Sequence, residues 1–286
     1  MSWPAIRTVA EFALRESLRR RVFVVVGILT LLFLAVYGAG AEWTFDETEE
    51  FGSFVPGVDE QAATGATLLG LAMFATLFLG TVLAVFLTLG AVRGDAESGL
   101  LQPIVVRPLE RRDVLAGRFL AAAGVCSVYV ATVFLLTALL TKLTGGWWPD
   151  RFFGPALGLA LGVCVVAALS LAGSVALSAT ANGIAIFMVF GAGLTAGLLG
   201  QIGEALNSDT LGSAANIATW VLPFEALYQD ALADITADTS GLTKFALELG
   251  PFGGAEEAGA LLWLYTLAYL AAVGAVATAG FARRDL

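Results

Sequence analysis

Five stretches without any Asp, Glu, Lys or Arg place the strongest limit on how this chain can fold. They cover residues 22–41, 61–92, 119–141, 152–203 and 258–282. A helix that crosses a bilayer needs about 20 mostly apolar residues at a rise of about 1.5 Å per residue. Each stretch is long enough for at least one crossing. The chain is therefore predicted to be an all-α, polytopic membrane protein.

The fourth stretch is long enough for two crossings. It has 52 residues, which as one helix would reach about 78 Å. A break is expected at residues 178–183, because Asn182 and Gly183 favour turns. The chain is thus predicted to form one transmembrane domain, residues 1–286, with six spans. The expected spans are about 22–41, 66–91, 119–141, 153–177, 183–203 and 259–281.

Basic residues predict the orientation of these spans, because cytoplasmic loops carry an excess of Lys and Arg. If the sides alternate from the N-terminus, 12 of the 15 basic residues fall on one side. The other side receives only Lys142, Arg151 and Lys244. Both termini are therefore expected in the cytoplasm, and the protein is expected in the plasma membrane.

Two segments outside the spans also have apolar character. Residues 1–21 place apolar side chains at helical spacing among five arginines, a pattern typical of an amphipathic helix along the inner leaflet. An ordinary charged anchor that sets the topology is the alternative. The external segment 204–257 is too apolar for a solvated loop, and Pro223 divides it. Two short helices that lie on the membrane or dip into it are expected there.

Small residues recur at helical spacing in the fourth stretch, at Gly154, Gly158 and Gly162 and again at Gly193 and Gly197. Such spacings let helices approach closely. Packing within one subunit is the favoured interpretation, with a contact between two subunits or a pathway lining as alternatives.

The cytoplasmic loop 93–118 is the candidate functional segment. It holds four acids, five arginines and two prolines around Leu100, Leu101 and Ile104. A connection between two helices needs only a few residues. This loop is long enough for a short helix with an apolar face and a charged rim, which suits docking into a groove on a soluble partner. A solvated face that only sets the topology is the alternative.

In this loop the sequence resembles the ABC-2 type permease family of ATP-binding cassette transporters. The family pattern has an acid and a glycine, then a proline, an arginine, an apolar pair and a glycine before the third span. The chain departs from it at Leu100, Glu110 and Arg118, where Thr, Ser and Lys are usual. The matching residues are Glu97, Gly99, Pro108, Arg111, Val114, Leu115 and Gly117. The topology resembles in particular the permeases associated with copper-enzyme maturation.

The resemblance implies a permease that works as a homodimer, or with a similar subunit, alongside a cytoplasmic ABC ATPase. It implies that residues 97–107 form a coupling helix that receives motion from the ATPase, with ATP and Mg bound on that partner. The resulting candidate coupling residues are Glu97, Gly99, Leu100, Leu101, Ile104, Arg107, Pro108, Arg111 and Arg112.

Several other functions are disfavoured by what the sequence lacks. The only lysines, Lys142 and Lys244, do not follow a glycine, so the sequence contains no P-loop and the chain is not expected to be an enzyme. Without histidine it can form neither a Ser-His-Asp triad nor an H-E-x-x-H metal site. No cofactor is expected in this chain.

The net charge of −9 argues against a nucleic acid partner, because phosphate binding needs clustered basic residues. The same acidic balance is typical of proteins that face high salt, and skewed genomic composition is the alternative. Two other functions stay open: a membrane scaffold or assembly factor without transport, and an ion-coupled secondary transporter. The apolar spans disfavour the latter, since such proteins usually carry ionisable residues within the membrane.

Overall fold

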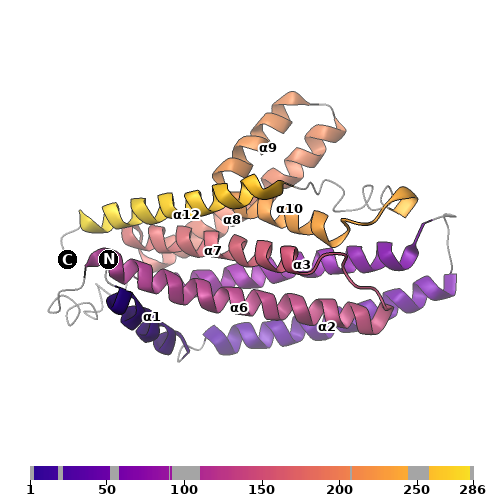
Figure 1. Cartoon of the computed structure of the whole chain (residues 1–286), viewed down its shortest axis with the longest axis horizontal. Helices are drawn as coiled ribbons and strands as arrows, with labels where there is room; N and C mark the ends of the chain where they lie inside the picture. Colours follow the sequence, from indigo (N-terminus) through magenta and orange to yellow (C-terminus); the bar gives the residue numbers. More distant parts are fainter. Residues whose placement is uncertain are drawn as a thin grey trace.

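The computed structural model describes residues 3–18, 22–51, 58–89, 91, 110–206, 208–243 and 258–283. Within these ranges the chain is a bundle of long helices with no strand (Figure 1). The helices are α1 (Trp3–Leu18), α2 (Val22–Phe51), α3 (Glu60–Thr88), α6 (Arg111–Gly145), α7 (Phe153–Ala176), α8 (Ala179–Ala205), α9 (Asp209–Val221), α10 (Pro223–Ile235) and α12 (Gly259–Ala282).

Six of these helices are long and apolar enough to cross a membrane: α2, α3, α6, α7, α8 and α12. The prediction of an all-α fold with six candidate spans is therefore confirmed. Several helices extend past the expected spans. α2 continues ten residues beyond 41, and α6 begins at Arg111, within the segment assigned to the cytoplasmic loop. A helix continues into water as long as its backbone bonds are made, so an apolar run marks the membrane crossing rather than the helix end.

Two helices form the centre of the bundle. In the most apolar 18-residue window of α3 and of α7, 67% of the residues are buried, against 11% in α12. The core packs α3 and α7 against α6 through side chains such as Leu77, Val130, Phe134 and Val163. The outer helices α2 and α12 expose large apolar side chains, including Leu31 and Leu261. A bundle in lipid keeps such surfaces apolar, because its solvent is hydrocarbon.

The turn between α7 and α8 lies at Leu177 and Ser178, and α8 already begins at Ala179. The chain thus reverses at the start of the 178–183 segment in which the break was expected. Asn182 is fully buried in the first turn of α8 rather than in the turn itself. Its side-chain Nδ2 donates a 2.8 Å hydrogen bond to the carbonyl oxygen of Ser170, which ties the ends of the two helices together.

α9 and α10 follow the last span-length helix before α12, and they separate at Leu222, next to Pro223. α10 packs into the bundle, whereas α9 projects from it together with the end of α8 (Figure 1). α10 lies against the glycines that the sequence places at helical spacing. A Cβ on Gly158 would lie 3.2 Å from the Leu227 carbonyl oxygen, and one on Gly193 would lie 2.4 Å from Cζ of Phe224. The favoured interpretation of these glycines, close packing within one subunit, describes what they do here.

Candidate functional site

The candidate site lies at the end of the bundle where the loop between α3 and α6 is attached. α3 ends at Thr88 and α6 begins at Arg111, and the start of α6 lies beside the end of α12 (Figure 1). Of the candidate coupling residues, Arg111 and Arg112 lie in the part of the chain that the structure describes. Glu97, Gly99, Leu100, Leu101, Ile104, Arg107 and Pro108 lie outside the described residues.

Arg111, the first residue of α6, binds the last turn of α12. Its Nη1 donates hydrogen bonds to the carbonyl oxygens of Phe281, at 2.7 Å, and Ala282, at 3.2 Å. Its guanidinium carbon also lies 5.5 Å from the centre of the Phe281 ring. The last carbonyls of a helix have no partner within the helix and carry partial negative charge, so a cation there is stabilising. Arg111 therefore connects the end of the loop to the C-terminal helix.

Arg112 points to a different environment from its neighbour. Its Nε pairs with the carboxylate of Glu110, and both side chains are about half exposed. The hydrogen bond from Arg112 lowers the pKa of Glu110. An exposed pair of this kind contributes little to stability. It does keep one basic and one acidic group at the surface where the loop joins α6.

The next residues of α6 anchor the loop end in the bundle. Asp113, Val114 and Leu115 are each less than 5% exposed. An acid in the first turn is favourable, because the helix N-terminus carries partial positive charge. Leu115 packs with Leu171 of α7 and with Ala277 and Phe281 of α12. A displacement of the loop end would thus act on α7 and α12 as well as on α6.

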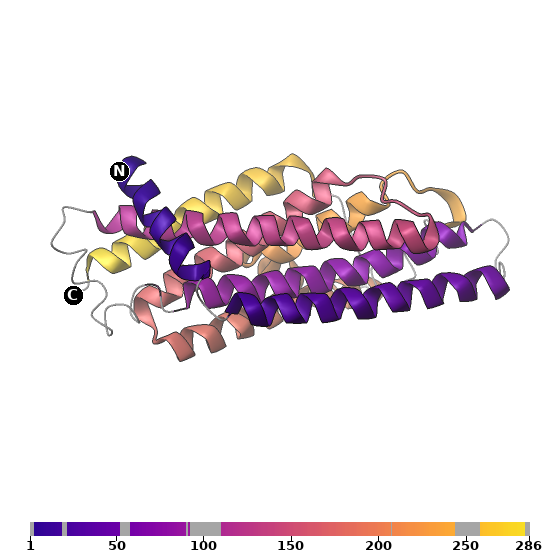
Figure 2. The ribbon, with the colours of Figure 1, turned by 90° about the horizontal axis from the view of Figure 1, so that it is seen from below.

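α1 lies across the start of α6 (Figure 2). Ile6 and Val9 of α1 are buried against it. The contact depends on Gly117, where a Cβ would lie 2.7 Å from Cβ of Val9 and 2.8 Å from the Ile6 carbonyl oxygen. Gly117 belongs to the sequence pattern described above, and its role in this chain is to let α1 approach the α6 backbone.

The sequence identified Arg111 and Gly117 but not their partners. Arg111 meets the end of α12, 170 residues later, and Gly117 meets α1, more than 100 residues earlier. The sequence showed only that an arginine and a glycine lie at the boundary of a predicted span, which does not identify their partners. Among the described residues, no group of three or more His, Cys, Asp or Glu side chains is arranged to hold a metal ion.

Comparison with known proteins gives the family. The family model described as "ABC-2 family transporter protein" matches residues 7–286. A curated relative, the probable ABC transporter permease protein NosY of Pseudomonas aeruginosa, is 30% identical over 117 residues. That match covers 41% of this chain and 38% of the relative, so it spans well under half of either protein. The family match confirms the resemblance inferred from the loop, and the chain belongs to the ABC-2 family of transporter proteins.

Proposed function

We propose that this protein is the permease of an ABC transporter that moves a substrate across the plasma membrane with ATP hydrolysed on a separate subunit. The observation that carries the proposal is the family match over residues 7–286, together with six helices of membrane-spanning length. ABC-2 permeases are membrane subunits without an ATPase site of their own. The ATP, its magnesium ion and the hydrolytic residues therefore belong to the partner in this proposal.

The contacts at the loop end support a role for the loop in coupling. The loop is attached to α3 on one side and to α6 on the other. At the start of α6, Arg111 hydrogen-bonds to the end of α12, and Gly117 lets α1 pack against the α6 backbone. A partner that moves the loop would therefore act directly on α3 and α6, and through packed or hydrogen-bonded contacts on α1, α7 and α12. Tightly packed helices move as units between discrete arrangements, which is how ligand binding at one site can expose a pathway at another.

The proposed transporter contains two copies of this chain, or one copy with a similar subunit, and both termini lie in the cytoplasm. Cysteine labelling tests the orientation. Cysteine at Glu47, an exposed residue near the end of α2, should react with a membrane-impermeant maleimide on intact cells. Cysteine at Arg112 should react only after permeabilisation. The native Cys126 and Cys164 are buried and provide a low background. The reverse labelling pattern would overturn the orientation.

Co-purification tests the function. Glu97→Arg with Leu101→Arg should abolish recovery of a P-loop ATPase with the permease while membrane insertion stays intact. The matched control is Glu47→Arg with Leu242→Arg, a pair of exposed residues far from the loop in the sequence, and it should leave recovery unchanged. Equal recovery from all three proteins would overturn the proposal. A different co-purifying partner without nucleotide binding would favour the scaffold, and transport in vesicles without nucleotide would favour the ion-coupled transporter.

A further inference from the structure

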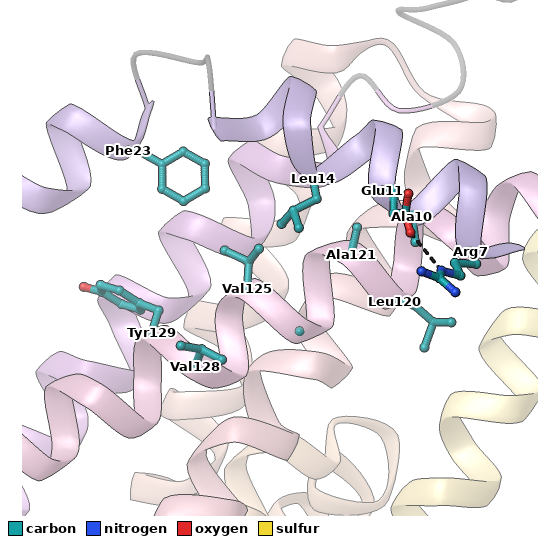
Figure 3. Close-up of a pocket in the computed structure, with 11 residues that line it drawn as sticks. Arg7, Ala10, Glu11, Leu14, Phe23, Leu120, Ala121, Val125, Val128 and Tyr129 are labelled. Carbon is teal, nitrogen blue, oxygen red and sulfur yellow. Dashed lines mark hydrogen bonds and ion pairs between the residues drawn. The ribbon is translucent and has the colours of Figure 1, made fainter.

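A groove runs along the outer surface of the bundle between α1, α2 and α6 (Figure 3). Its volume is about 650 Å³. One wall is a face of α1 from Arg7 to Leu14, and the other is a face of α6 from Leu120 to Tyr129, with Phe23 of α2 at the far end. Tyr129 lies nine residues after Leu120 in the same helix, so the α6 wall is about 14 Å long.

The walls of the groove are apolar and accessible. Leu14 is 38%, Leu120 45% and Val128 69% exposed. Gly124 leaves the floor open, because a Cβ there would meet no atom within 4 Å. The one hydroxyl in the wall, on Tyr129, is hydrogen-bonded at 2.6 Å to Thr30 Oγ1 of α2. The groove therefore offers its occupant an aromatic ring at that end rather than a polar group.

The other end of the groove is charged. Arg7 lies beside Leu120, toward the beginning of α6, and its Nε pairs with Glu11 at 2.8 Å (Figure 3). Both side chains are at least half exposed. The contact with Glu11 uses Nε, and the Arg7 side chain is 72% exposed, so its guanidinium is accessible to a second acceptor. Arg7 and Glu11 are the charged residues that line the groove.

A groove with an exposed guanidinium at one end and a long apolar remainder selects the chemistry of its occupant. The occupant needs an anionic group for Arg7 and an apolar chain of roughly 14 Å for the α6 wall. An extended peptide would expose unsatisfied backbone groups to the surrounding hydrocarbon, which costs several kcal/mol per group. An acyl chain has no such groups, and a phosphate accepts hydrogen bonds from the fork of an arginine.

We propose that this groove binds one anionic phospholipid, with a headgroup phosphate on Arg7 and an acyl chain along α6 between Leu120 and Tyr129. The lipid would fill the space between α1 and the α2–α6 pair and so hold α1 on the bundle. Its assignment to the inner leaflet rests on the proposed cytoplasmic position of the termini. The binding itself does not depend on that orientation or on the ATPase.

Native mass spectrometry of the full chain released from nanodiscs tests the site. The nanodiscs contain equal amounts of dioleoyl phosphatidylglycerol, which is anionic, and dioleoyl phosphatidylethanolamine, which is zwitterionic. The unmodified protein should retain phosphatidylglycerol preferentially. Arg7→Ala should reduce that preference about fivefold, which corresponds to about 1 kcal/mol per basic residue at a membrane surface. The control Arg283→Ala removes an exposed arginine at the end of α12, outside the groove, and should leave the preference unchanged.

A substitution that fills the groove distinguishes binding of a whole lipid from binding of a phosphate group at Arg7 alone. Gly124→Leu has room for its side chain and should abolish retention of the lipid, although Arg7 is intact. Gly274→Leu on α12, where a Cβ also meets nothing within 4 Å, should leave retention unchanged. Equal retention of both lipids by the unmodified protein, or undiminished retention by Gly124→Leu, would overturn the site. Recovery of the ATPase with Gly124→Leu should be normal, so a failure here is distinct from a failure of the proposed function.

Discussion

The helices α9 and α10 have the same length, 13 residues, and are separated by one residue, yet they have opposite surroundings. Ten residues of α10 are buried, including Phe224 and Leu227, which are fully inaccessible. In α9, Ile217, Trp220 and Val221 are each at least half exposed. Both helices are apolar enough to pack against a bundle. The difference lies in what faces them.

Glycines on two other helices provide the surface for α10. Gly158 and Gly162 of α7 lie under the α10 backbone, and Gly193 and Gly197 of α8 lie under Phe224 and Glu225. Without side chains at these positions, α10 can pack closely against both α7 and α8. α9 contacts the end of α8. The two helices approach closely at Gly203, where an added Cβ would lie 3.0 Å from the Gly212 nitrogen. A short helix is thus buried where its partners leave space for it.

The largest effect should come from truncating Phe224, one of the largest fully buried side chains in the described residues. Phe224→Ala removes a ring that is stacked 5.4 Å from Phe190 and is fully buried. The free energy of unfolding should fall by about 3–5 kcal/mol, because a cavity replaces the ring. Denaturant titration of the full chain in detergent measures it. Ile217→Ala on α9, 66% exposed, should change it by less than about 0.5 kcal/mol. Similar losses for both variants would show that α9 is as well packed as α10.

The second-largest effect should be a dependence of stability on pH that arises from Glu225 in α10. This helix is not one of the six spanning helices. Glu225 is 3% exposed, and burial raises its pKa from 4.5 to about 7, although a hydrogen bond from Gln229 Nε2 lowers it in part. Its other oxygen, Oε2, accepts no hydrogen bond from the described residues. Between pH 4.5 and 7 the unfolded state loses this proton first. Stability should therefore be full below pH 4.5 and fall by about 3 kcal/mol as the pH rises through 7.

Glu225→Gln isolates that titration. The amide has nearly the same shape and does not titrate, so the loss of stability between pH 4.5 and 7 should disappear in this variant. The measurement is the denaturation midpoint at a series of pH values. Asp209→Asn, in the first turn of α9, is the control and should retain the pH dependence of the unmodified protein. A Glu225→Gln profile that still falls over this range would assign the dependence to another group.

A smaller effect is expected from closing the glycine surface. An alanine Cβ at Gly193 would lie 2.4 Å from the Phe224 ring, so Gly193→Ala should lower stability by about 1–3 kcal/mol through overpacking. Gly212→Ala on α9 meets no atom within 4 Å and should raise stability by up to about 1 kcal/mol, because alanine favours the helix. Thermal denaturation of the pair distinguishes the two signs. A stabilised Gly193→Ala variant would mean that α10 does not depend on this close approach.

The smallest effect should come from the end of α10. Arg151 Nη1 pairs with Asp234 at 2.8 Å, and the arginine side chain is 52% exposed. Arg151→Ala should cost less than about 1 kcal/mol, because solvent screens such a pair. Raising the salt concentration should lower the stability of the unmodified protein toward that of the variant. A loss comparable to that of Phe224→Ala would show that charge, rather than packing, holds α10.

Much of the fold was predictable from the sequence, because the length of an apolar run is a local property. The runs at 22–41 and 258–282 identify α2 and α12 without knowledge of any other helix. Helix ends were less predictable. α6 begins at Arg111 rather than near residue 119. The charged residues at its start are held in the helix because Arg111 hydrogen-bonds to the end of α12 and Gly117 lets α1 pack against α6. In the candidate site, the residue types were accessible and their partners were not.

The sequence by itself determined that this chain forms six apolar helices, with its arginines concentrated on one predicted side and a charged loop between the second and third. Tertiary structure alone decided that α10 is buried and α9 is not, that α1 lies over Gly117, and that Arg111 closes the end of α12. The physical reason is the range of the forces. The free energy of transferring an apolar run into hydrocarbon is a sum over consecutive residues. Close packing instead requires complementary shapes from segments that are distant in sequence.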